Sequence, residues 1–189
     1  MAEEFLGERK RLLEEEFFKK QERALLERMH AAQAQQARRD ALAQAAGVTD
    51  VAVLDRLLAL GIDADTLLAM RLVPVVAVAW ADGALDSRER QAITASLGSV
   101  GLAPDSPAAQ MVTNWLQSPP PPALLDAWQA YMAGLCAQLS ASERESLRTS
   151  VLGQARAVAE AAGGFLGFGA KVSQAEETIL QTLARAFTG

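Results

Sequence analysis

The helical character of this chain is clearest in one stretch, residues 75–90, which reads VVAVAWADGALDSRER. The apolar run from Val75 to Ala81 has no polar stripe, and this predicts a helix that is buried on most sides. Pro74 suits the first turn of such a helix, where its missing N–H would have had no helical partner. Gly83 suits the left-handed position that commonly ends a helix. The stretch therefore predicts a buried helix, a tight turn and the start of a second helix.

Three carboxylates gather at this turn, namely Asp82, Asp86 and Glu89. Asp86 and Glu89 have the spacing of a capping box, in which each side chain bonds the backbone N–H of the other residue. In a functional interpretation, the three side chains supply hard oxygen ligands to Ca²⁺ or Mg²⁺ and form the candidate metal site. In a structural interpretation they cap the helix and accept bonds within the turn. We favour the structural one, because capping alone explains two of the three residues and the spacing does not match an EF-hand loop.

Size and composition indicate a helical protein with one core, or with one core and an appendage. The chain has 189 residues, half of them hydrophobic and only 5% aromatic, and alanine is abundant. This balance favours helix over strand, so the expected fold class is all-α. The longest apolar run, Leu72–Ala81, is about half of what a membrane-spanning helix needs. The acidic N-terminus lacks the apolar core of a signal peptide, so we expect a cytoplasmic protein without a transmembrane segment.

The residues available for catalysis are few. Cys136 is the only cysteine and His30 the only histidine, and these counts exclude intrachain disulfides and Cys/His zinc sites. Cys136 stands in an apolar pattern, which is typical of a buried, unreactive thiol. No nucleophile, base and oxyanion donor can be named together, so we expect no enzyme, no catalytic residues and no residues dedicated to an organic cofactor.

The charge is unevenly distributed. Residues 1–46 contain nine basic and nine acidic residues, so the whole net charge of −5 falls on residues 47–189. Nucleic-acid-binding proteins concentrate positive charge on one face, and this distribution argues against that class.

The first 46 residues are predicted to form a long amphipathic helical arm. Residues 8–46 contain neither proline nor glycine, and apolar residues recur along them at mixed helical spacings. These are Leu12, Leu13, Phe17, Phe18, Leu25, Leu26 and Met29. The arm either binds a protein partner or a second copy of the chain, or it packs back on its own body. The sequence leaves both open, because the apolar face is not a sustained heptad repeat.

Residues 47–189 are predicted to form a second, all-helical domain with a degenerate internal repeat, at about 72–100 and 151–188. Val158–Gly163 echoes Val78–Gly83, and Ser173 with Glu176 repeats the capping box without its aspartate. Two helix–turn–helix units packed together would explain both copies. The Gly/Phe-rich insertion at 163–170 is expected to be a hairpin whose phenylalanines cover the core, with an exposed contact as the alternative.

The segment Ala79–Glu89, with its Ala-Asp-Gly turn followed by Asp86 and Glu89, resembles the repeated signature of the tellurite-resistance TerB-like family. The resemblance covers roughly residues 50–189, and the second copy departs from it because Ala162 stands at the position of Asp82. It implies a compact bundle of two related helical units, no known enzymatic activity and a divalent-cation site at the acidic turn. It also implies links to stress responses and to membrane-associated complexes, so contact with a membrane surface stays open.

Two functions follow as expectations. The first is a non-catalytic TerB-like binding module that acts through protein partners and responds to a divalent cation. The alternative is a scaffold protein that oligomerises through its N-terminal helix, in which the acidic turn is purely architectural.

Overall fold

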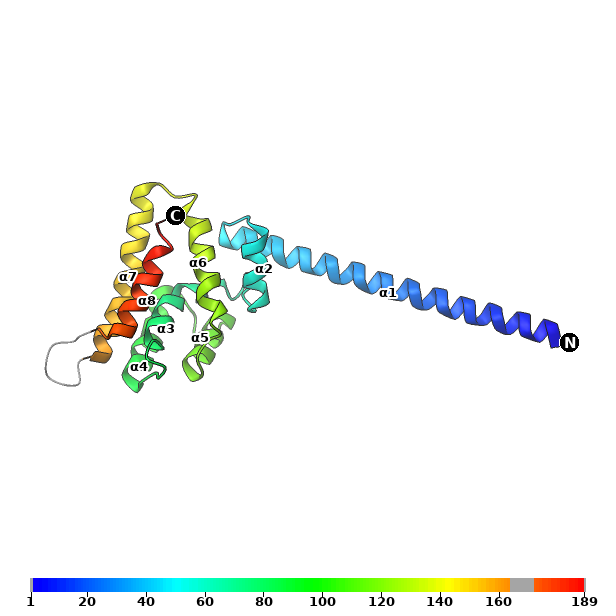
Figure 1. The fold of residues 1–189 in the computed structure, drawn as a ribbon, viewed down its shortest axis with the longest axis horizontal. Coiled ribbons are helices and arrows are strands. Elements are labelled where there is room, and N and C mark those ends of the chain that lie inside the picture. The colour runs from blue at the N-terminus through cyan, green and yellow to red at the C-terminus, as the bar shows by residue number, and fades with distance from the viewer. Residues whose placement is uncertain (1, 164–171, 189) are drawn as a thin grey trace. The chain divides into compact units, whose positions relative to one another are not determined.

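The computed structural model describes residues 2–163 and 172–188, and this part of the chain is built from helices without any strand (Figure 1). The predicted all-α class is therefore confirmed. The α-helices are α1 (Ala2–Ala46), α2 (Val51–Ala59), α3 (Val73–Ala79), α4 (Ser87–Ser96), α5 (Pro107–Gln117), α6 (Ala123–Cys136), α7 (Ala141–Gly163) and α8 (Gln174–Arg185). Among these helices, none combines the length and the apolar character needed to cross a membrane.

The chain divides into two compact units, Met1–Asp40 and Ala41–Gly189. We call the first the arm and the second the body. Helix α1 runs through the boundary and ends where Gly47 adopts the left-handed conformation, with φ +66°. The boundary lies before the end of this helix because Leu42 and Ala46 are buried in the core of the body.

Helix α3 lies in the core of the body, where it packs against α6, α7 and α8. Six of its seven residues are buried, as expected for a segment without polar side chains. Pro74 occupies its first turn, as predicted. Figure 1 shows α7 and α8 running side by side next to α3.

Helix α3 ends two residues before the predicted end at Ala81, and the segment before it is a 3₁₀ helix. Before α3, residues Leu67–Leu72 form a 3₁₀ helix. Just ahead of this helix, the backbone N–H and the hydroxyl of Thr66 both donate to the Asp63 carboxylate. After it, α3 stops at Ala79, and Gly83 follows in the turn with the predicted positive φ of +87°. The Trp80 indole N–H donates to the carbonyl of Trp115 at 2.8 Å. This bond joins the turn to the last part of α5.

A close approach fixes α6 against the chain that follows α1. A Cβ added at Gly134 would lie 3.1 Å from Cγ1 of Val48, a side chain that is itself buried. Glycine inside a helix costs about 0.5–1 kcal/mol relative to alanine. Glycine is nevertheless suited to position 134, because the side chain of Val48 occupies the space next to where a Cβ would lie.

Three helices of the body begin with capping boxes, and these include the two predicted above. They are formed by Asp86 with Glu89 in α4, by Ser140 with Glu143 before α7, and by Ser173 with Glu176 in α8. Capping depends on residues within one turn, and this is why the sequence alone locates it. The relation between the two predicted repeat units stays a prediction, and the Gly/Phe-rich insertion lies almost wholly outside the described residues.

Candidate functional site

The acidic turn, consisting of Asp82, Asp86 and Glu89, joins α3 to α4. Asp82 is exposed, and its carboxylate accepts a hydrogen bond from the backbone N–H of Ala84 at 3.0 Å. This is a local Asx-type bond that stabilises the turn around Gly83. The Asp82 carboxylate therefore takes part in a hydrogen bond with the backbone of its own turn.

Asp86 and Glu89 bind each other's backbone. One Asp86 oxygen, Oδ1, accepts from the N–H of Arg88 at 2.7 Å and from the N–H of Glu89 at 2.8 Å. In return, Oε2 of Glu89 accepts from the N–H of Asp86 at 2.9 Å. These bonds satisfy N–H groups that the first turn of α4 leaves without helical partners.

Glu89 is the electrostatically unusual member of the turn. Its side chain is buried, with 6% of the residue exposed. This burial raises the pKa of Glu89, the hydrogen bond from Asp86 N–H opposes the rise, and the charges on Asp86, Asp82 and Glu176 add to it. A charged carboxylate in this position costs free energy, because it has lost water and lies in the field of other carboxylates.

The arrangement around these carboxylates suits the architectural interpretation. Across the described residues, no three His, Cys, Asp or Glu side chains form a group that could hold a metal ion. The three predicted ligands direct oxygens to separate backbone N–H groups. Sequence reasoning predicted the capping box and allowed Glu160 and Glu176 to add to the acidic corner if the two halves packed suitably. In the structure the charge on Glu176 acts on Glu89.

Cys136 and His30 occupy different surroundings. Cys136 is buried in the core at the end of α6, and burial raises the pKa of its thiol, which disfavours the nucleophilic thiolate. His30 lies exposed on the arm.

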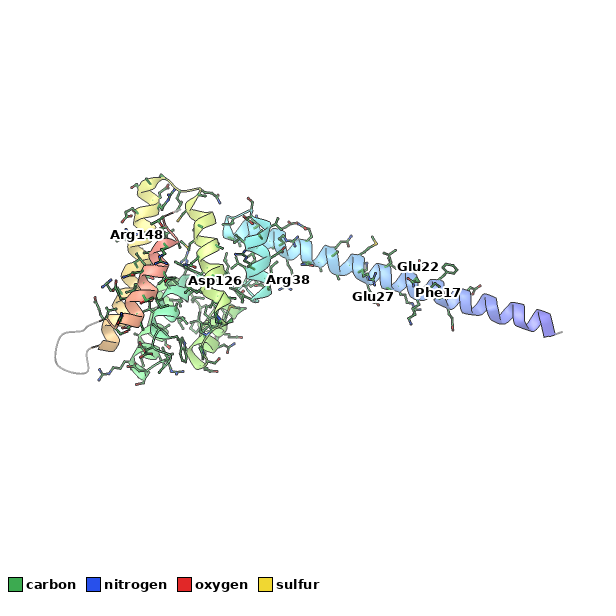
Figure 2. All side chains as sticks on the ribbon, viewed as in Figure 1. Phe17, Glu22, Glu27, Arg38, Asp126 and Arg148 are labelled. Carbon is green, nitrogen blue, oxygen red and sulfur yellow. The ribbon has the colours of Figure 1, made fainter. Side chains whose placement is uncertain are left out.

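The most exposed apolar surface that the structure describes lies on the arm. We call its five residues the apolar stripe, and their exposed fractions run from 47% to 68%. They are Phe17, Phe18, Leu25, Leu26 and Met29. At 3.6 residues per turn they fall within about half of the helix circumference. Arg23 and Glu27 lie on the opposite half, and Figure 2 labels Phe17 and Glu27.

Searches among family models, curated proteins and solved structures found nothing that matches this chain.

Proposed function

We propose that this protein is a non-catalytic, TerB-like helical binding module that acts through protein partners, and that it binds them through the apolar stripe of the arm. The observation that supports this most directly is the exposure of two phenylalanines, two leucines and a methionine within 13 consecutive residues, 17–29. Scattered exposed apolar residues are normal, whereas a contiguous group of large ones is typical of an interaction surface.

The energetics of such a surface are favourable for a helical partner. Burying one large apolar side chain contributes about 1.5–3 kcal/mol relative to leaving it exposed. Phe17 and Phe18 already contact each other edge to face, with ring centroids 6.1 Å apart. A partner helix that covers the stripe would remove most of its five side chains from water, in the manner of helix-in-groove recognition.

The alternative function is a scaffold in which the partner is a second copy of the same chain. The charge balance of the arm supports it, because residues 15–28 carry four acidic and four basic side chains and therefore have no net charge. Two copies of this segment would therefore not repel each other strongly on approach.

In both functions we assign the acidic turn an architectural role, supported by its hydrogen bonds to the backbone. The competing assignment is the divalent-cation site that the family resemblance implies, with Asp82, Asp86 and Glu89 as ligands to Ca²⁺ or Mg²⁺. A stress-response role rests on the same resemblance.

The test is the mass of the full chain in solution over a range of concentrations, measured by light scattering. For the scaffold, we expect a concentration-dependent oligomer that the variant Phe18→Ser/Leu25→Ser loses. The matched control, Arg23→Ser/Glu27→Ser, changes the opposite face and should keep the oligomer. A wild-type chain that stays monomeric at every concentration rejects the scaffold.

For the binding module, a purified partner protein should bind the wild-type chain and the control variant, and should bind Phe18→Ser/Leu25→Ser at least tenfold more weakly. Equal binding to all three would reject the apolar stripe as the binding surface.

A further inference from the structure

The body contains an open cleft of about 430 Å³ that lies between the 3₁₀ helix Leu67–Leu72, α6 and α7. Its walls are mainly apolar, with Leu68, Met70, Trp128, Met132 and Val151 among the lining residues. Both the volume and the apolar lining lie in the range of small-molecule binding sites. None of its lining residues belongs to the acidic turn or to the apolar stripe.

One charged side chain, Arg71, lines this cleft among the described residues. Arg71 is exposed, and its Nη1 donates to the carbonyl of Val100 at 3.2 Å. Within the described part of the chain, no aspartate or glutamate forms an ion pair with it. A guanidinium has five N–H donors, so most of its donors remain for a ligand or for water.

The Tyr131 hydroxyl is a second polar group in the cleft. Burial raises the pKa of Tyr131, and the positive charge of Arg71 acts against this rise, so the field of Arg71 reaches the hydroxyl. The hydroxyl therefore stays protonated at neutral pH, and its bond to the carbonyl of Ala46 is long, at 3.4 Å.

We propose that this cleft binds a small amphipathic anion, a medium-chain fatty acid, with the carboxylate on Arg71 and the hydrocarbon chain against Met70, Trp128 and Met132. Three features point to this class of ligand. The apolar walls suit a hydrocarbon chain, and the positive charge without a described carboxylate partner suits a single anionic head. The planar fork of arginine matches the geometry of a carboxylate, with which it forms paired hydrogen bonds.

The experiment is calorimetric titration of the full chain with octanoate, decanoate and dodecanoate, each below its micelle-forming concentration. Burial of one methylene is worth about 0.8 kcal/mol, so the Kd should tighten about fourfold for each added methylene. Decanol and decyltrimethylammonium have the same hydrocarbon chain without the anionic head. We expect both to bind at least tenfold more weakly than decanoate.

Two test variants, each with a matched control, locate the site. Arg71→Gln removes the charge, keeps a donor for Val100 and should weaken decanoate about tenfold, the lower end expected for a hydrogen bond to a charged group. Arg56→Gln is the matched control, because Arg56 is an exposed arginine in the last turn of α2 and does not line the cleft. It should bind like wild type.

Leu68→Glu, which places a negative charge at an exposed position of the cleft, should abolish binding of decanoate, whereas Leu68→Gln should retain most of it. Unchanged melting temperatures show that each variant is folded.

Three results would overturn the proposal. The first is the absence of binding by all three carboxylates. The second is that the charges do not contribute to binding, seen either as equal binding of decanoate and decanol or as a decanoate affinity that Arg71→Gln leaves unchanged. The third is binding to vesicles of anionic lipid without binding of the free acids, which would assign the surface to a membrane instead.

Discussion

Glu89 and Glu176 hold the same position in two capping boxes, as the third residues of α4 and α8, and the charge on Glu176 helps to raise the pKa of Glu89. Both residues are buried, with 6% and 8% of their surface exposed. Two helix starts that are far apart in the sequence are therefore linked by repulsion between their glutamates. This relationship has a direct consequence for stability against pH.

We expect Glu89→Gln to flatten the pH dependence of the free energy of unfolding. The pKa of Glu89 is higher in the folded chain than the usual 4.5, so the folded state favours the protonated side chain. This contribution to stability is fully present below pH 4.5 and is lost as the pH rises through the folded pKa. Glutamine keeps the hydrogen bond to Asp86 N–H without the charge. Urea denaturation at a series of pH values should show the variant at least as stable as wild type at neutral pH. A variant clearly less stable there would contradict this account.

Glu143→Gln should act in the opposite direction. The side chain and backbone of Ser140 both donate to the Glu143 carboxylate, and these bonds lower its pKa. Its contribution to stability is present above the usual pKa of a glutamate and disappears as the pH falls through the lowered value. The same denaturation series should show a small loss for Glu143→Gln at neutral pH that vanishes in acid. If both glutamine variants shift stability in the same direction, burial does not distinguish the two boxes.

Asp86→Ala should cost about 1 kcal/mol of stability, because it removes the acceptor for two N–H groups at the start of α4. If the acidic turn has an architectural role, Asp86→Ala loses the same amount of stability with or without Ca²⁺ or Mg²⁺. Thermal melting of wild type and variant, each with and without the ions, makes the comparison. A melting temperature that the ions raise in wild type alone would instead identify Asp86 as a ligand. Asp82→Ala is the milder control, because the Asp82 carboxylate accepts a hydrogen bond from one N–H group, that of Ala84.

Two truncations should differ sharply in stability. A chain that begins at Ala41 keeps Leu42, which is 0% exposed, and Ala46, and it should melt close to the full-length protein. A chain that begins at Gly47 loses both, and emptying the position of a buried leucine costs about 2–5 kcal/mol. Leu42→Ala in the full chain is the control and should reproduce much of that loss. Equal melting temperatures for the two truncations would show that the body does not depend on the last turns of α1.

The sequence predicts those parts of this fold that depend on neighbouring residues. The three capping boxes, the left-handed Gly47 and Gly83, and the burial of α3 all follow from patterns within a few residues. Burial of Leu42 does not, because it depends on contacts with core residues that are distant in the sequence. The cleft around Arg71 and Tyr131 was not foreseen for the same reason, since its walls come from segments that are distant in the sequence.

The candidate site shows the same division. The hydrogen bonds of Asp86 and Glu89 were predictable from their spacing, whereas the raised pKa of Glu89 required knowing that it is buried and that Glu176 lies in its field. A capping pattern has the same sequence whether its glutamate faces water, as Glu143 does, or the interior. Only the packing of the helix on its neighbours decides between them.

The close approach of Gly134 and Val48 also bears on how this chain can diverge. A methyl group at position 134 would lie 3.1 Å from Cγ1 of Val48, so an alanine there requires Val48 to shift by a few tenths of an ångström, and a smaller residue at position 48 would remove that requirement. The two positions, 86 residues apart, should therefore change together over evolutionary time, with glycine opposite a β-branched residue or alanine opposite a smaller one. Among related sequences, such paired changes would show that this close approach is retained.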